Sequence, residues 1–209
     1  MNTLLKATFP LRDLKYFVIY KPFGVLSQFS EADGHPGLGS IYAFPKDVYA
    51  IGRLDRDSEG LLILSNDQKL NHKLLNPKFA HNRTYLTQVE GIPEIKELEA
   101  FEKGIVIKVN KKAYHTKPAK VQLIEAPEYL PERTPPIRFR KNKPTSWLAL
   151  SINEGKNRQV RKMTAKIGYP TLRLVRKSIV GLHLLSYIPG SVQEIDQKDL
   201  YKKLNLNFK

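Results

Sequence analysis

The first side chain able to do chemistry lies in residues 52–65, where a charged turn runs directly into an apolar strand. Asp55 follows the apolar Leu54, so its carboxylate is expected at the rim of the core, where an ionised oxygen can act as a nucleophile. The alternative is an aspartate that only closes a turn, which is the commoner role of a loop carboxylate. By itself this segment leaves both roles open.

Residues 82–85 form a second polar segment, which leads into a strand and ends on Tyr85. Aromatic side chains mostly pack in cores, and they also stack on nucleobases when a pocket exposes one face. Tyr85 is therefore either a core residue or a platform for a base.

The third segment is a helix expected over residues 157–167. At 100° per residue, its apolar side chains share one stripe, formed by Val160, Met163, Thr164 and Ile167. Arg158, Lys162 and Lys166 lie opposite, towards solvent or phosphate. Arg161 falls on the border, about 100° from Val160. An arginine there can turn inward to a carboxylate or extend along the surface into solvent.

A fold that mixes strands and helices must position these segments. Short apolar or alternating runs predict strands at residues 16–20, 48–51, 61–65, 84–90, 105–109, 120–124 and 147–152, and extended chain over 172–184. Helices are predicted at 67–75 with Asn66 as its cap, 93–103, 157–167 and 197–204. Because there is no regular βαβ alternation, we expect an α+β fold with a mixed, largely antiparallel sheet flanked by helices and loops.

Residues 126–146 are the one stretch that reads as a long loop. The segment holds five prolines and ends in a basic cluster, formed by Arg138, Arg140, Lys141 and Lys143. Loops of this length inside a compact domain are usually functional or disordered. The alternatives are a segment that selects RNA, with Tyr129 and Phe139 stacking on bases, and a tolerated insertion.

The charge of the chain points to a polyanionic partner. The formal net charge is +15, and residues 138–177 hold twelve Lys/Arg against the single acid Glu154, a net of 12 − 1 = +11. A concentrated basic face is typical of proteins that bind a phosphate backbone.

Other residue types exclude whole classes of function. The chain has no cysteine, which excludes disulfides, thiolate metal sites and cysteine nucleophiles. The five histidines show no ligand spacing, so they give no sign of a metal site. No apolar run approaches the roughly 18 residues of a membrane span, and residues 1–10 lack a signal-peptide core. We therefore expect a cytoplasmic protein without a membrane partner.

Together, the polar motifs resemble those of the RsuA-type family of pseudouridine synthases. The matching motifs are Tyr-Lys-Pro-Phe-Gly at 20–24, Gly-Arg-Leu-Asp at 52–55, Arg-Thr-Tyr at 83–85 and the basic segment at 154–163. Their order and spacing fit over about residues 16–200.

The resemblance implies the pseudouridine synthase fold. Residues 1–14 would be an N-terminal tail. Residues 15–209 would be a catalytic domain of two subdomains that share an extended sheet with a cleft between them. Many relatives carry an S4 RNA-binding module before the first motif, and here that motif begins too early for one. Residues 55–60, 135–138 and 144–147 resemble a large-subunit member without that module. A uridine of 23S rRNA near the peptidyl transferase centre is therefore the implied substrate, in free rRNA or in a large-subunit assembly intermediate, and the enzyme is expected to be a monomer.

The resemblance also implies roles for individual residues. Asp55 would be the catalytic carboxylate, Arg161 the cation that keeps it ionised, and Tyr85 the ring that stacks on the flipped base and helps to remove the C5 proton. Attack on the sugar, attack on C6 and assisted elimination all stay open for Asp55. The reaction implied by the resemblance involves no redox step or phosphoryl transfer, so no metal and no cofactor are expected. Arg53 would fill the gap left by the base. The other expected RNA contacts are Arg83, Arg138, Arg140, Lys141, Lys143, Lys156, Arg158, Lys162 and Lys166.

Two other functions compete with this interpretation. A ribosome-assembly factor that has lost its chemistry would keep the charge, but the intact set of Asp55, Tyr85 and Arg161 argues against it. A uridine methyltransferase would use a thiolate, which the chain lacks, and we find no glycine-rich cofactor loop after a strand.

Overall fold

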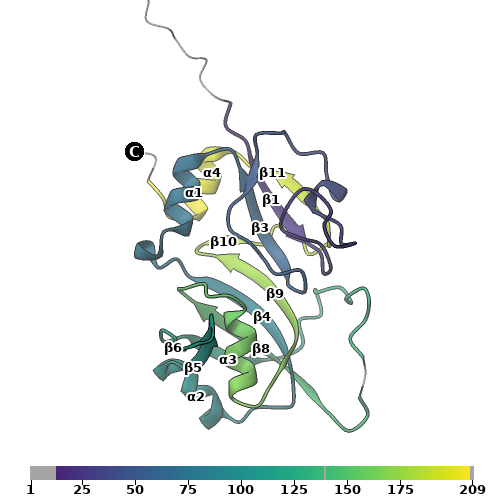
Figure 1. Cartoon of the computed structure of the whole chain (residues 1–209), viewed down its shortest axis with the longest axis vertical. Coiled ribbons are helices and arrows are strands. Elements are labelled where there is room, and N and C mark those ends of the chain that lie inside the picture. The colour runs from purple at the N-terminus through teal and green to yellow at the C-terminus, as the bar shows by residue number, and fades with distance from the viewer. Residues whose placement is uncertain (1–12, 139, 208–209) are drawn as a thin grey trace, which may run out of the picture.

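The computed structural model describes residues 13–138 and 140–207. The predicted tail over 1–14 therefore lies almost wholly outside the described residues, as does Phe139. One nine-stranded sheet runs through the molecule, and its main path has the order β11-β1-β3-β9-β4-β8-β7. The β3–β9 pair is parallel and the other pairs are antiparallel. The predicted α+β fold with a mixed, largely antiparallel sheet is confirmed (Figure 1).

The strands differ in length according to their place in the sheet. The long, central ones are β1 (Tyr16–Lys21), β3 (Glu59–Ser65), β4 (Arg83–Glu90), β8 (Thr145–Ile152) and β9 (Thr171–Ile179). The shorter ones are β2 (Tyr49–Ala50), β7 (Lys120–Ile124), β10 (Leu182–His183) and β11 (Val192–Glu194). A separate hairpin joins β5 (Val106–Val109) to β6 (Lys112–His115). Every residue of β3 is buried, as its continuous apolar run predicts for a strand covered on both faces.

In the described part of the chain, four α-helices cover the sheet in two pairs. The α1 (Gln68–Leu75) and α4 (Gln197–Lys203) helices pack together beside β1 and β3, whereas α2 (Ile95–Lys103) and α3 (Gln159–Lys166) lie beside β4 and β8 (Figure 1). Their apolar stripes enter two core clusters. Leu70 and Leu200 belong to one, and Phe101 and Met163 belong to the other. No helix in the described part of the chain is long and apolar enough to cross a membrane.

Two local predictions need correction. Asp67 caps α1 by accepting hydrogen bonds from the amides of Lys69 and Leu70, and Asn66 does not. The side chain of Asn66 instead accepts from the amide of Lys15 at 2.8 Å, a contact 51 residues away that local patterns do not reveal. The predicted extended run over 172–184 is also interrupted. A turn at Val180, whose φ is +52°, separates β9 from β10.

Candidate active site

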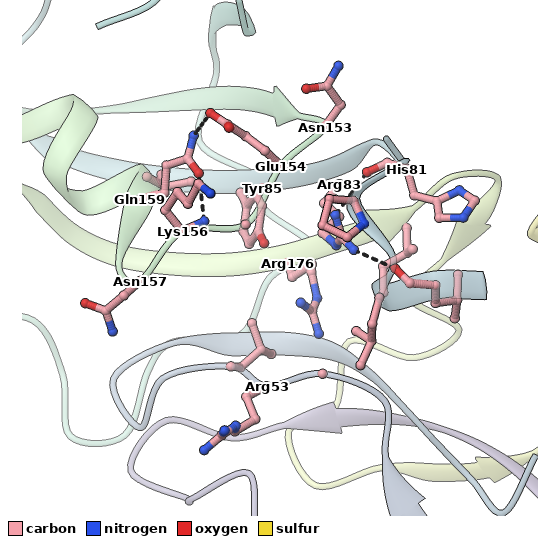
Figure 2. Close-up of a pocket in the computed structure, with 18 of the residues that line it drawn as sticks. Arg53, His81, Arg83, Tyr85, Asn153, Glu154, Lys156, Asn157, Gln159 and Arg176 are labelled. Atoms are coloured by element: carbon pink, nitrogen blue, oxygen red, sulfur yellow. Dashed lines mark hydrogen bonds between the residues drawn. The ribbon is translucent and has the colours of Figure 1, made fainter. Parts of the chain in front are cut away.

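The main pocket is lined by residues of β4 and β9 and by the segment that precedes β3. Its volume of about 740 Å³ is within the range of roughly 300–1,000 Å³ typical of ligand pockets. The segment with Asp55 forms one wall, and the strand with Tyr85 and the segment leading into α3 form others. Figure 2 shows Tyr85 and Arg176 on neighbouring strands, with Arg53 on the loop across from them. The pocket therefore brings together all three polar segments found in the sequence.

Asp55 begins a tight turn between β2 and β3. The amide of Ser58 donates to the carbonyl of Asp55 at 3.0 Å, which closes the turn. Its side chain is about one third exposed, so the carboxylate is reachable from solvent while Leu54 beside it is buried. The turn thus presents the carboxylate at the rim of the core, as the sequence predicted.

The backbone before and after Asp55 is fastened to the segment that follows β1. The hydroxyl of Ser27 donates to the carbonyl of Leu54 at 2.7 Å and accepts from the amide of Leu54 at 3.0 Å. The amide of Gly24 donates to the carbonyl of Arg56 at 2.9 Å. Both neighbours of Asp55 are therefore held by hydrogen bonds to residues 24–27, which extend the motif at 20–24.

Lys21 is a fully buried cation beneath this turn. Its Nζ donates to the carbonyls of Pro22 at 2.8 Å and Val25 at 2.7 Å. Burial lowers the pKa of Lys21 to about 7, even though the carboxylates of Glu59, Asp57 and Asp55 favour its charged form. In the sequence, Lys21 is part of the motif at 20–24, and its residue type alone indicates no role.

The arginines of the third segment contact Asp57, which the sequence analysis did not single out. Arg158 donates to both oxygens of Asp57, at 2.8 and 2.7 Å. Arg161 donates to the backbone carbonyl of Asp57, and its Nε lies 3.4 Å from the carboxylate. Burial raises the pKa of Asp57, but hydrogen bonds from Arg158 and the charge of Arg161 outweigh it and leave the pKa lowered. Asp57 is therefore held ionised between two cations.

This geometry corrects two expectations. Arg161 does turn inward to a carboxylate, but within the described residues its ion pair is with Asp57, and the cation closest to Asp55 is Arg158, with Nη1 3.7 Å from Oδ2. Arg158 does not simply face outward. Arg158 is the N-cap of α3 and has φ +52°, so its backbone is not helical. The helical projection that predicted an outward direction therefore does not apply to its side chain.

Tyr85 is buried on β4, with 8% of its surface exposed. It stands opposite Leu150 on β8 and Arg176 on β9. Because it also lines the pocket, the two roles considered for it are compatible, since one part of the ring packs in the core and another borders the cavity. Arg176 was not identified from the sequence. The only sequence feature that bears on Arg176 is its position in the run predicted to be extended. That position does not show whether the arginine has a hydrogen-bond partner.

The other predicted RNA contacts lie in different environments. Arg53 is exposed at the pocket, whereas the guanidinium of Arg83 is held by the carbonyls of His81 and Leu74, at 3.1 Å each. Lys156 lies 4.7 Å above the ring of Tyr114 at the pocket.

Two basic residues on α3 lie outside the lining of the pocket. The Nζ of Lys162 donates to the carbonyl of Asn157 at 2.7 Å, and Lys166 is exposed.

The basic end of the long loop is divided. Arg140 and Lys143 both pair with Glu90, at 3.0 and 2.9 Å, while Arg138 and Lys141 are exposed. The loop is also fastened at its beginning, where Leu130 is buried and the carbonyl of Pro131 accepts from Arg173 at 2.8 Å. Between these attachments it extends to the side of the sheet (Figure 1).

Comparison with known proteins assigns the family. Residues 15–166 match the family described as RNA pseudouridylate synthase. The chain belongs to the RNA pseudouridylate synthase family. This pseudouridine synthase is thus an isomerase, which decides against the methyltransferase and against a factor without chemistry. No group of His, Asp and Glu within the described residues could hold a metal ion.

Individual relatives support the assignment over most of the chain. It is 50% identical to ribosomal large subunit pseudouridine synthase E of Vibrio parahaemolyticus, covering 88% of this chain and 75% of the relative. It is 47% identical to the protein of the same name from Xanthomonas axonopodis pv. citri, covering 78% and 84%. A crystal structure of a pseudouridylate synthase superposes with a TM-score of 0.74 at 26% identity, over 92% of this chain and 75% of the other. The resemblance to the RsuA-type family is confirmed.

Proposed function

We propose that this enzyme converts one uridine of 23S rRNA to pseudouridine, with Asp55 as its catalytic carboxylate. The observation that supports the proposal is the pocket itself, whose lining includes both Asp55 and Tyr85, in a chain whose relatives are named for the large ribosomal subunit. The pocket is too small for a duplex and suits a single nucleotide that has been turned out of the RNA.

The reaction requires an ionised carboxylate, a platform for the base and a route for the C5 proton. Arg158 brings positive charge beside the carboxylate, since it lies 3.7 Å from Asp55 while bound to Asp57. Tyr85 would stack on the flipped uracil and assist removal of the C5 proton. Asp55 would attack the sugar or C6, or assist elimination. Because the product is an isomer of the substrate, no redox or group-transfer cofactor is needed.

RNA would approach through the cations that line the pocket and the neighbouring face of α3. Arg53 would occupy the space that the flipped base leaves, and Arg83, Lys156, Arg158, Lys162 and Lys166 would line the path of the backbone. Arg138 and Lys141 on the long loop would contact phosphates farther away. Free 23S rRNA or a large-subunit assembly intermediate would be the partner of a monomeric, cytoplasmic enzyme.

A direct experiment is to incubate the purified protein with transcribed 23S and 16S rRNA and to map pseudouridine by carbodiimide modification and reverse transcription. The proposal predicts one new pseudouridine in 23S rRNA and none in 16S rRNA. Modification of 16S rRNA alone would refute the assigned substrate, and modification of neither RNA would direct the test to assembly intermediates isolated from a strain without the gene. Absence of a new pseudouridine there as well would refute the proposed function.

A further inference from the structure

Arg176 is a buried arginine whose hydrogen bonds are incomplete. It lies on β9 with 5% of its surface exposed, and it lines the pocket together with Asp55 and Tyr85. Its Nε donates to the carbonyl of Leu61 at 2.7 Å, but Nη2 is buried and has no hydrogen-bond partner. No ion pair to Arg176 is present within residues 13–138 and 140–207.

A second arginine on the same strand shows what a structural role looks like. Arg173 is equally buried, and it donates to both oxygens of Glu59 at 2.9 Å and to the carbonyl of Pro131 at 2.8 Å. Burying a charge without a partner is costly, so buried arginines are normally satisfied in this way. Arg176 departs from that rule, and it does so at the wall of the pocket.

The backbone around Arg176 is built for close approach. Gly60 on β3 pairs with Arg176, and a Cβ at position 60 would lie 2.4 Å from the Arg176 carbonyl. Gly60 also has φ +100°, which other residues rarely adopt. Glycine at this position therefore lets β9 lie against β3, next to the turn that carries Asp55. Figure 2 shows the guanidinium of Arg176 extending from β9 towards the loop of Arg53, on the same side as Tyr85.

We propose that Arg176 contacts the substrate, with its guanidinium donating a hydrogen bond to a carbonyl oxygen of the flipped uracil. This inference rests on the proposed function and adds a residue for recognition of the base. A phosphate is the less suitable ligand. A buried guanidinium at the pocket wall reaches a base that has entered, whereas the exposed cations at the mouth reach the backbone.

The contact would also favour the reaction. When the bond between C1′ and N1 breaks, its electron pair stays with the base and spreads onto O2 and O4. A buried donor stabilises this charge more strongly than water does. C5 then bonds to C1′ and releases its proton, and N1 gains one, so no other reagent is consumed. Arg176 acts on the base while Asp55 acts on the sugar or on C6.

The test compares Arg176→Met with Arg173→Met on an RNA that the wild-type enzyme modifies. Single-turnover formation of pseudouridine should fall about 100-fold in Arg176→Met, as expected for loss of one buried donor. The melting temperature of this variant should stay within a few degrees of wild type, since the arginine removed has no acidic partner. Arg173→Met should instead lose thermal stability, because Glu59 is left buried without its cation and keeps only the hydrogen bond from Tyr20.

A second readout separates contact from mere positioning. The target uridine is replaced by 2-thiouridine or by 4-thiouridine, since sulfur is a weaker acceptor than oxygen. At the oxygen that Arg176 contacts, sulfur should slow the wild-type enzyme, and this effect should disappear in Arg176→Met. If Arg176→Met does not fold, the same comparison of oxygen and sulfur substrates is made with Arg176→Gln, which keeps an amide donor.

The outcomes distinguish this inference from the proposed function. A wild-type enzyme without pseudouridine activity on any ribosomal RNA would refute the function. An active wild type with Arg176→Met within threefold of its rate would refute only the role of Arg176. Equal sulfur effects in wild type and variant, at both oxygens, would also overturn it.

Discussion

Arg158 and Asp57 join the N-terminus of α3 to the turn that carries Asp55. Arg158 donates to both oxygens of Asp57, at 2.8 and 2.7 Å, while its Nη1 lies 3.7 Å from the carboxylate of Asp55. One guanidinium therefore lies beside two carboxylates of the same turn, and its hydrogen bonds are to Asp57. The pair both places the turn and supplies positive charge beside Asp55.

Loss of the ion pair between Arg158 and Asp57 should lower the rate of the chemical step. We predict that Asp57→Asn and Arg158→Ala each lower single-turnover pseudouridine formation by about 10-fold or more, because a small misplacement of the reacting group is costly. Asp57→Asn should leave RNA affinity nearly unchanged, since it removes no cation. Lys198→Ala on α4, an exposed cation away from the pocket, is the matched control. Rates for Asp57→Asn equal to that of the control would contradict the positioning role.

The pKa of Lys21 predicts a specific dependence of stability on pH. Burial lowers the pKa of Lys21 from 10.5 to about 7, so between these values the unfolded chain binds the proton and the folded one does not. The free energy of unfolding therefore rises with pH across this window, relative to a variant without the group. Urea denaturation should show wild type gaining about 2 kcal/mol over Lys21→Met between pH 7 and 9.

The comparison of Lys21 needs a control and a direct measurement. Lys198→Met, which removes an exposed lysine, should follow the wild-type pH profile. If Lys21→Met does not fold, NMR titration of the Lys21 side chain in the wild-type enzyme gives the pKa itself. A midpoint near 10.5 would contradict the lowered pKa.

Local patterns were sufficient for the motifs but not for the contacts between them. The placement of Asp55 at the rim of the core followed from the polar turn before an apolar strand. The helical projection placed Arg161 on the border of the apolar stripe and left open whether it turns inward or extends into solvent. The pairing of Arg158 with Asp57 could not be predicted, because the left-handed N-cap falls outside that projection and the partners are 101 residues apart. Whether Arg176 has a hydrogen-bond partner depends on the residues of the neighbouring strands. The sequence of β9 alone does not contain that information.

Glu90 should limit the affinity of the long loop for RNA. Its carboxylate pairs with Arg140 and Lys143, so its single negative charge offsets part of their positive charge and holds both side chains. Glu90→Gln should free both, raise the affinity for 23S rRNA a few-fold at low salt and steepen its dependence on salt. Filter binding across a salt series measures both quantities. An unchanged salt slope would indicate that this end of the loop does not reach the RNA.

The free part of the long loop should matter for selection of the target. Replacing residues 134–142 with a short Gly-Ser bridge leaves Leu130, the contact of Pro131 with Arg173, and the catalytic residues in place. We predict a larger fall in modification of 23S rRNA than in melting temperature, since Arg138, Arg140 and Lys141 are lost, whereas none of the described residues 134–138 and 140–142 is buried. Modification of the same uridine at an unchanged rate would assign selection to the basic surface around the pocket instead.

The role of Asp55 is tested most directly by Asp55→Asn. This substitution removes the ionised oxygen and keeps the shape of the side chain, and RNA binding rests on other, positively charged groups. The measurement is release of tritium from C5-labelled uridine in 23S rRNA, with no other substrate added, beside filter binding of the same RNA. The account predicts binding within a few-fold of wild type and no release above background. Measurable turnover by a folded Asp55→Asn protein would contradict it.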